Sequence, residues 1–181
     1  MQAVRDLSHR LAVEADRDVI ASLMEAAIGE LQRPFLTPEQ ITSSRAIMGL
    51  DSQLIADGTY FVVESEGQVV GCGGWSRRAT LYGGDQTTQR SPRLLDPARE
   101  AARVRAMYTH PAHVRRGIAR LILELCERAA SAEGFTTVEL TSTLSGEPLY
   151  EACGYRALER VEDARGGVPV PLIRMRKAVV R

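Results

Sequence analysis

The sequence has few cysteines and no long apolar run, and these absences exclude several classes of protein. Its three cysteines, Cys72, Cys126 and Cys153, lie far apart in apolar surroundings, with no Cys-x-x-Cys pair and no paired histidines. This spacing excludes a disulfide framework and a cysteine metal site, and it favours buried, reduced thiols. No apolar run approaches the roughly 20 residues that span a membrane, and the N-terminus has no signal-peptide core. We therefore expect a cytoplasmic protein with no membrane partner and no metal.

An excess of either charge is also absent, because lysine plus arginine and aspartate plus glutamate each total 23 residues. Without net charge there is no long-range attraction to anionic polymers, so we expect no nucleic-acid partner. The P-loop pattern Gly-x-x-x-x-Gly-Lys-Ser/Thr and the dinucleotide pattern Gly-x-Gly-x-x-Gly are missing as well. The 181 residues contain no internal repeat. They suffice for a single α/β domain over 1–181 that buries about 70% of its unfolded surface.

Hydrophobic periodicity predicts two helices ahead of the main sheet. A polar tail over 1–9 and a short strand over 10–13 precede a helix with Asp16 as its N-cap. The residues TPEQ at 37–40 have the pattern of a capping box with proline at the first helical position. They predict a second helix that runs to about Ala56.

The rest of the chain is predicted to alternate strands and helices around one long irregular segment. That segment, 78–101, is rich in glycine, threonine and proline, and its length indicates either a binding loop or disorder. The other predicted elements are strands over 59–64 and 68–75 joined by a tight turn, a strand over 103–109, a helix from 118 to Gly134, a strand over 135–141, a short helix over 148–153, and strands over 156–161 and 171–175.

The stretch from Thr109 to Arg120 is the most informative part of the chain. It joins the strand over 103–109 to a clearly amphipathic helix through a turn that contains Gly117 and two arginines. The first N–H groups of a helix have no partner within it and carry about half a positive charge, so they can hold a phosphate. Glycine lets that phosphate reach the main chain. The alternative is an ordinary loop before a surface helix, but the flanking strand and helix favour a phosphate site.

This turn resembles the acyl-CoA pyrophosphate loop of the GNAT superfamily of N-acetyltransferases, whose pattern is Arg/Gln-x-x-Gly-x-Gly/Ala. Residues 114–119 read VRRGIA, so Val114 stands where the family has Arg or Gln. A second family pattern, Leu-Tyr-x-x-x-Gly-Phe/Tyr, is present as LYEACGY at 149–155. The resemblance extends from about Tyr60 to Lys177. It implies an α/β (α+β) fold with a mixed, mostly antiparallel central sheet of about six to seven strands flanked by helices.

The resemblance also implies roles for individual residues. The pantetheine arm of acetyl-CoA would bond to the main chain at Met107 and Thr109, where the strand separates from its neighbour. Tyr150 would protonate the departing thiolate, because a phenol with an ordinary pKa of about 10 is protonated at neutral pH. The alternative is that Tyr150 only packs the short helix, and Tyr155 is expected in the core. The pyrophosphate would lie on Val114, Arg115, Arg116, Gly117, Ile118, Ala119 and Arg120.

The base that takes a proton from the acceptor amine is less clearly indicated. Glu139 lies on a predicted strand between two apolar residues, so its side chain points away from theirs and is the first candidate. Glu100 and His110 are weaker candidates, and an ordered water could replace all three.

Other residues near the predicted strand over 103–109 concern the acceptor. Arg103 and Arg105 alternate on one face of that strand, with Val104 and Ala106 on the other. The two arginines either fix an anionic part of the substrate or pair with nearby carboxylates. Trp75 and Tyr82 flank the long loop and either wall an acceptor pocket or, for the lone tryptophan above all, belong to the core.

Together these features predict an acetyl-CoA-dependent N-acetyltransferase that acts without a metal on a primary amine. The acceptor, a small molecule or a peptide, is not identified, and a homodimer is left open. The loop over 78–101 is expected to select the acceptor, the alternative being a disordered insertion without consequence. A non-catalytic acyl-CoA-binding or regulatory module is the other functional hypothesis, but such a module would not need Tyr150.

Overall fold

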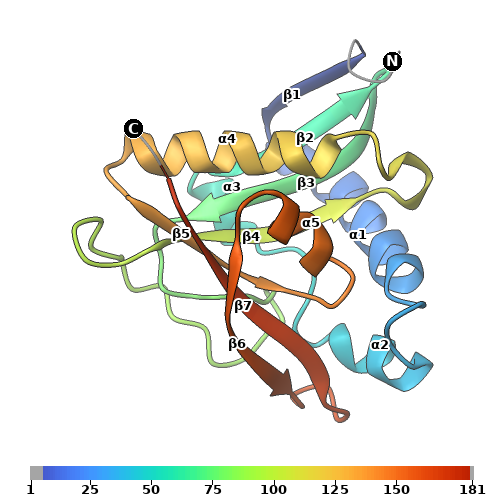
Figure 1. Ribbon diagram of the computed structural model, residues 1–181. Helices are drawn as coiled ribbons and strands as arrows, with labels where there is room; N and C mark the ends of the chain where they lie inside the picture. Colours follow the sequence, from blue (N-terminus) through green and yellow to red (C-terminus); the bar gives the residue numbers. More distant parts are fainter. Residues whose placement is uncertain (1–5, 180–181) are drawn as a thin grey trace.

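The computed structural model describes residues 6–179 of the chain. Within this range seven strands form one mixed sheet, with helices on both faces (Figure 1). The strands are β1 (Leu7–Leu11), β2 (Tyr60–Ser65), β3 (Gln68–Ser76), β4 (Ala102–Thr109), β5 (Thr137–Ser142), β6 (Arg156–Asp163) and β7 (Val170–Ala178). Their order is β1-β2-β3-β4-β5-β7-β6, and only β4 and β5 run parallel. The predicted mixed, mostly antiparallel sheet is thus confirmed.

Two apolar clusters hold the helices against the two faces of the sheet. The helices are α1 (Arg17–Leu31), α2 (Pro38–Ser44), α3 (Ser52–Ala56), α4 (Ile118–Ala132) and α5 (Glu147–Ala152), with 3₁₀ turns η1 (Glu14–Asp16) and η2 (Pro111–His113). One cluster joins α4 to the sheet through Ile122 and Cys126, and the other joins α1 through Ile20 and Met24. None of the helices between residues 6 and 179 is long and apolar enough to cross a membrane.

The N-terminal segment differs from the prediction. The polar tail expected over 1–9 is wrong from Leu7 onward, because β1 begins there and pairs antiparallel with β2; residues 1–5 lie outside the described part of the chain. As an edge strand β1 needs only the backbone ladder, so most of its side chains are exposed and give little apolar signal. Asp16 does precede α1, but its carboxylate pairs with Arg10 (2.7 Å) and does not cap the helix.

The predicted helix from Pro38 to about Ala56 is two helices. Its start is confirmed: the Thr37 hydroxyl accepts from the N–H of Gln40 (3.2 Å), and the Gln40 amide accepts from the N–H of Thr37 (3.0 Å). The helix ends at Ser44, and Gly49, with a φ of +129°, excludes a continuous helix to Ala56. Asp51 then caps α3 through the N–H of Gln53 (3.0 Å).

Strand β4 contains a bulge that changes which side chains share a face. Cys72 pairs with Tyr108 and Gly74 with Arg105, so β4 has one more residue than β3 between these pairs. Ala106, with a φ of +51°, occupies the bulge. The alternation expected past Arg105 is therefore wrong, and Ala106 packs with Tyr108 toward α1.

The long segment over 78–101 has no helix or regular strand, as predicted, but it is tied down at many points. Arg78 and Leu94 form an antiparallel bridge, and the N–H of Leu95 bonds to the carbonyl of Arg77 (2.8 Å). Thr87 is buried and donates to the carbonyl of Ala46 (2.8 Å). The segment is thus a binding-loop candidate that packs on the region between α2 and α3.

The three cysteines are free thiols, as the sequence predicts. Cys72 and Cys126 are buried, whereas Cys153 is half-buried. Burial raises the pKa of the Cys72 thiol to about 12, which favours an unreactive thiol.

Candidate active site

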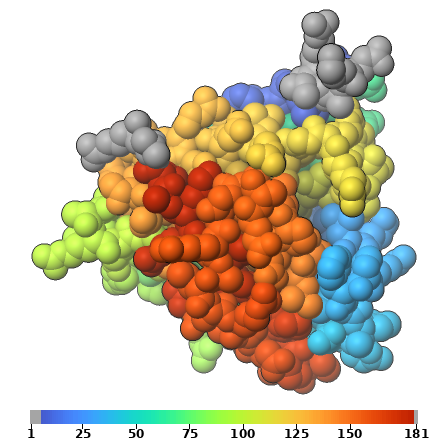
Figure 2. Space-filling view, viewed as in Figure 1, coloured from blue at the N-terminus to red at the C-terminus, as the bar shows by residue number. Residues whose placement is uncertain are grey.

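A cavity of about 800 Å³ lies where β4 and β5 separate. The ladder between these strands has only two pairs, Ala102 with Val138 and Arg103 with Glu139. Beyond Arg103 the edge of β4 that faces β5 has no ladder partner, so its main-chain groups are available to a ligand. The cavity runs from the start of α4, past β4 and α5, to α1 and the loop at 81–83. On the face shown in Figure 2, the chain after β5 covers the centre and meets α1 and α2 at one side.

The turn before α4 presents free N–H groups at one end of this cavity. Gly117, the N-cap, has a φ of +80°, and Arg115 has a φ of +62°. The first helical bond runs from the N–H of Leu121 to the carbonyl of Gly117 (3.0 Å), so the N–H groups of Ile118 and Ala119 have no partner within α4. No heavy atom lies within 4 Å of the position a Gly117 Cβ would occupy. The turn is therefore open enough for a phosphate.

The structure brings most of the predicted donor-binding residues to the cavity. Arg116 is the exception, because it does not line the cavity and its Nη1 lies 2.6 Å from Nδ1 of His113. The Ile118 side chain is in the core, which leaves its main chain to face the cavity. The predicted residues that line the cavity are Met107, Thr109, Val114, Arg115, Gly117, Ile118, Ala119, Arg120 and Tyr150.

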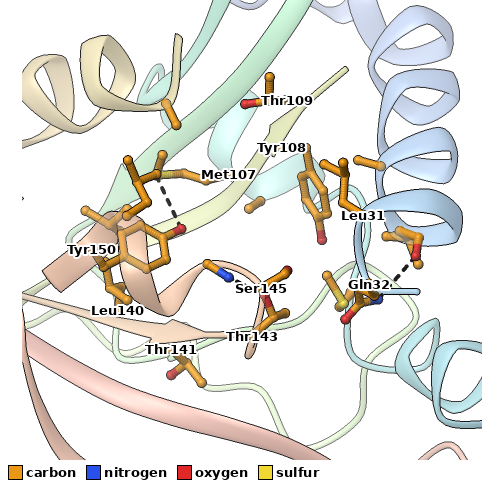
Figure 3. A pocket seen from close by; sticks show the side chains of 18 of the residues that line it. Leu31, Gln32, Met107, Tyr108, Thr109, Leu140, Thr141, Thr143, Ser145 and Tyr150 are labelled. Carbon is orange, nitrogen blue, oxygen red and sulfur yellow. Dashed lines mark hydrogen bonds between the residues drawn. The ribbon is translucent and has the colours of Figure 1, made fainter. Parts of the chain in front are cut away.

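Tyr150 projects from α5 into the cavity (Figure 3). Its hydroxyl has one weak contact, to Sδ of Met107 at 3.9 Å, so it remains able to donate to a ligand. Burial raises the pKa of this phenol above its ordinary value of 10. Tyr155 is buried, as predicted, and its hydroxyl donates to Glu127 (3.0 Å) away from the cavity.

Glu139 does not face the cavity. It points to the sheet face opposite α4, as the alternation predicts, but there it contacts Arg103 (2.8 Å), Arg174 and Arg176. Burial acts to raise the pKa of this carboxyl, yet the three guanidinium groups outweigh it and the pKa is lowered. A carboxylate held in this way is a weak base and is not placed to reach an amine in the cavity.

The weaker candidates for a base are not in the cavity either. Glu100 accepts from Arg93 (2.7 Å) on the outside of the long loop, and Nδ1 of His110 accepts from the N–H of Ala112 (3.1 Å). Among the described residues that line the cavity there is no aspartate, glutamate or histidine. Nor does the described part of the chain group His, Cys, Asp or Glu side chains so that they could hold a metal ion.

Both arginines of β4 pair with carboxylates, although only one of them lines the cavity. Arg103 pairs with Glu139, whereas Arg105 lines the cavity and pairs with Asp51 (2.9 Å). Trp75 belongs to the core and packs edge-on to Phe135. Tyr82 does line the cavity, and its hydroxyl donates to Asp163 (2.7 Å).

Sequence reasoning missed the polar groups at the far end of the cavity. Figure 3 shows Tyr150 and Met107 on one side and Leu31 and Gln32 on the other, with Thr143 and Ser145 between them. Gln32 directly follows α1 as its C-cap and is 2% exposed. Nothing in the local sequence of an amphipathic helix distinguishes such a residue from its exposed neighbours, so no signal was available.

Residues 56–157 match the profile of the Acetyltransferase (GNAT) domain family. The chain is a member of the GNAT acetyltransferase family. No curated protein matches the sequence. A GCN5-related N-acetyltransferase from Rhodopseudomonas palustris has the same fold, with a TM-score of 0.72, 18% identity and 96% of each chain covered.

Two further solved structures share this GNAT fold and were determined with a ligand of the coenzyme A type. PaiA N-acetyltransferase from Thermoplasma acidophilum, in complex with coenzyme A, has a TM-score of 0.64 and 12% identity over 95% of this chain and 98% of that chain. The acetyltransferase yncA from Salmonella typhimurium, with acetyl-CoA, has a TM-score of 0.63 and 19% identity over 97% of this chain and 95% of that chain. At these identities the likeness concerns the fold.

Proposed function

We propose that this GNAT protein transfers the acetyl group of acetyl-CoA to a primary amine, with Tyr150 as the general acid. The main support is a single cavity that joins three features: the open turn at Gly117, the unpaired edge of β4 and the weakly bonded hydroxyl of Tyr150. Each feature suits one part of the donor, namely its pyrophosphate, its pantetheine arm and its leaving sulfur.

The donor end of the cavity fits acyl-CoA through main chain and positive charge. A Cβ is missing where the pyrophosphate would approach Gly117, and Arg115 and Arg120 line the same end. The free N–H groups of the first turn of α4 would hold the phosphate oxygens. The edge of β4 between Met107 and Thr109 would pair with the amides of the pantetheine arm, as a neighbouring strand would.

The reaction exchanges one bond for another. The nitrogen lone pair of the neutral amine forms a bond to the acetyl carbon, the C–S bond breaks, and the sulfur receives the proton of the Tyr150 hydroxyl. The nitrogen loses a proton to water, because the described cavity residues include no carboxylate or imidazole to accept it, and water returns a proton to the Tyr150 phenolate. Proton transfer from a placed acid contributes about 10²–10⁴-fold to such a step.

A non-catalytic acyl-CoA-binding module is the alternative. It would need the donor end alone, but here the cavity continues past Tyr150 to Gln32 and Arg105. Buried polar side chains at a point that the donor does not need favour a second substrate.

The test measures thiol release from acetyl-CoA over a panel of primary amines, for the parent protein and for Tyr150→Phe. We expect kcat to fall about 10²–10⁴-fold, with an unchanged Kd for acetyl-CoA by calorimetry. Tyr155→Phe is the matched control, because it removes a hydroxyl of the same motif that bonds to Glu127 outside the cavity. If both variants retain the parent kcat, Tyr150 is not the acid; if no amine releases thiol, the module hypothesis is correct.

A further inference from the structure

We propose that the amine acceptor carries a carboxylate, which Arg105 binds, next to an apolar group. This inference rests on the proposed function and identifies the class of the second substrate. It starts from the charges that line the cavity. In the described part of the chain these are Arg105, Arg115 and Arg120, with no acidic residue. Since the other two arginines belong to the donor end, Arg105 supplies the charge at the acceptor end.

Arg105 is buried but incompletely paired. It is 3% exposed, and its hydrogen bonds run from Nη2 alone, to Asp51 (2.9 Å) and to the carbonyl of Gly83 (2.7 Å). Its Nε is buried with no partner among residues 6–179. A guanidinium has five N–H donors in a planar fork that matches a carboxylate. A buried N–H donor without a partner destabilises the protein. The N–H donors of Arg105 that have no partner therefore favour an anionic ligand.

Asp51 does not neutralise this site, because it is shared. Its Oδ2 lies 2.9 Å from Arg105 and 2.9 Å from Arg90, while its Oδ1 caps α3. Two guanidinium groups on one carboxylate leave a net positive charge around Asp51, with Arg105 buried and Arg90 27% exposed. Burial lowers the pKa of Arg105, which Asp51 opposes but does not cancel. A carboxylate on the substrate would complete the pairing.

The backbone around Arg105 is arranged to keep this side chain in place. Arg105 precedes the bulge at Ala106, whose carbonyl accepts from the hydroxyl of Tyr60 (2.7 Å). The carbonyl of Gly83 holds the guanidinium from the long loop. A positioned arginine loses less entropy on binding an anion than a mobile one does.

The rest of this region is largely apolar, and two further side-chain oxygens of the cavity lining, on Gln32 and Thr141, are buried without a partner in the described chain. Oε1 of Gln32 is buried without a partner in the described chain, whereas its Nε2 bonds to Ile28 and Ser44. This oxygen can accept a bond from a substrate N–H or O–H. The apolar lining residues at this end include Leu31, Phe35, Ile47, Met48, Leu81 and Leu172. A polyamine or an aminoglycoside, which has several positive charges, would find no carboxylate here.

The first experiment uses the parent protein and a matched pair of amines. L-phenylalanine and phenethylamine share the primary amine and the ring, and only the former has a carboxylate; spermidine represents the polycations. With rates expressed per neutral amine, we expect kcat/KM for L-phenylalanine to exceed that for phenethylamine by about 100-fold, or about 2.7 kcal/mol. Spermidine should be the poorest of the three.

The second experiment compares Arg105→Gln with Arg103→Gln. Arg105→Gln should remove most of the preference for L-phenylalanine and leave the Kd for acetyl-CoA unchanged. Asp51 would still be paired with Arg90, so its buried carboxylate keeps one ion-pair partner and the variant should fold. Arg103→Gln is the matched control on the same strand, because Arg103 faces Glu139 and not the cavity. If Arg105→Gln does not fold, Arg105→Lys, which retains the charge without the fork, should show a weaker preference.

Calorimetry of both amines with the coenzyme A-saturated protein separates this inference from the proposed function. Tighter binding of L-phenylalanine than of phenethylamine supports the inference even if neither is acetylated. Acetylation of both amines with equal kcat/KM overturns the inference and leaves the acetyltransferase activity standing. Equal preference in the Arg105→Gln and parent proteins overturns the role of Arg105.

Discussion

The two ends of the cavity are built from different kinds of group. At the proposed donor end the main chain would supply most of the contacts, through the turn at Gly117 and the free edge of β4. At the proposed acceptor end the contacts would come from the side chains of Gln32 and Arg105, which are far apart in sequence, and Gly83 in the long loop holds Arg105. A main-chain site depends on a few local φ angles, whereas a side-chain site depends on how distant segments pack.

The largest effect that separates the two ends is expected at Gly117. Asparagine and aspartate both tolerate the left-handed conformation and have nearly the same shape, so Gly117→Asn and Gly117→Asp differ mainly in charge. We expect Asn to weaken acetyl-CoA binding about tenfold and Asp about 100-fold, because only the latter repels the pyrophosphate. The measurement is Kd by calorimetry.

Both variants should fold as well as each other, because a Cβ at this position has no heavy atom within 4 Å. Their melting temperatures provide the control. Equal Kd values for the two variants would mean that no phosphate lies at this turn. Loss of acceptor binding in either variant would contradict the division of the cavity into two independent ends.

The pH dependence of the reaction should be set by the pKa of the acceptor amine and not by a titrating group of the cavity. The raised pKa of Tyr150 keeps its acidic form present up to at least pH 10, since its proton is lost only as the pH rises through the raised value. Below the pKa of the acceptor amine, kcat/KM should therefore rise about tenfold per pH unit, as the neutral amine does.

Two acceptors whose amine pKa values differ by about two units test this directly. The pH at which kcat/KM levels off should move with the amine. A plateau that stays at one pH for both acceptors would reveal a titrating base in the protein, and a decline below pH 9 would show that Tyr150 is not held in its acidic form.

The same contrast explains what could be predicted from the sequence. The turn at Gly117 and Tyr150 each belong to a local sequence pattern, and the structure brings both to one cavity, because local patterns determine main-chain conformation. Glu139 was assigned to the right face of its strand, but what covers that face comes from Arg103 and the distant Arg174 and Arg176. Alternation gives the direction of a side chain and not its neighbours.

Long-range packing also explains why the bulge in β4, the break between α2 and α3 and the role of Gln32 could not be predicted from the sequence. The bulge at Ala106 appears only when β4 is aligned with β3, and no local pattern in β4 indicates it. The break between α2 and α3 begins after Ser44 and contains Gly49 with a positive φ, so the otherwise helical pattern does not continue to Ala56. Gln32 was missed because burial beside the cavity, not residue type, makes it notable.

The smallest effect concerns the loop over 78–101, at Thr87. Its hydroxyl donates to the carbonyl of Ala46 (2.8 Å) and accepts from the N–H of Gly84 (2.9 Å), next to the Gly83 carbonyl that holds Arg105. Thr87→Val keeps the shape but leaves both main-chain groups without a partner, at a cost of about 1–3 kcal/mol. We expect the melting temperature to fall by about 2–8 °C.

Thr87→Val should weaken acceptor binding and leave acetyl-CoA binding unchanged. A displaced Gly83 carbonyl loosens Arg105, so KM for the acceptor should rise about threefold to tenfold, or about 0.7–1.4 kcal/mol, while the Kd for acetyl-CoA stays within about a factor of two. Thr88→Val is the matched control, because Thr88 is the exposed neighbour. If the acetyl-CoA Kd rises in step with the acceptor KM, the long loop supports the whole cavity, and the separation of its two ends is wrong. If Thr87→Val lowers the melting temperature without a change in KM, the loop stabilises the fold but does not position Arg105.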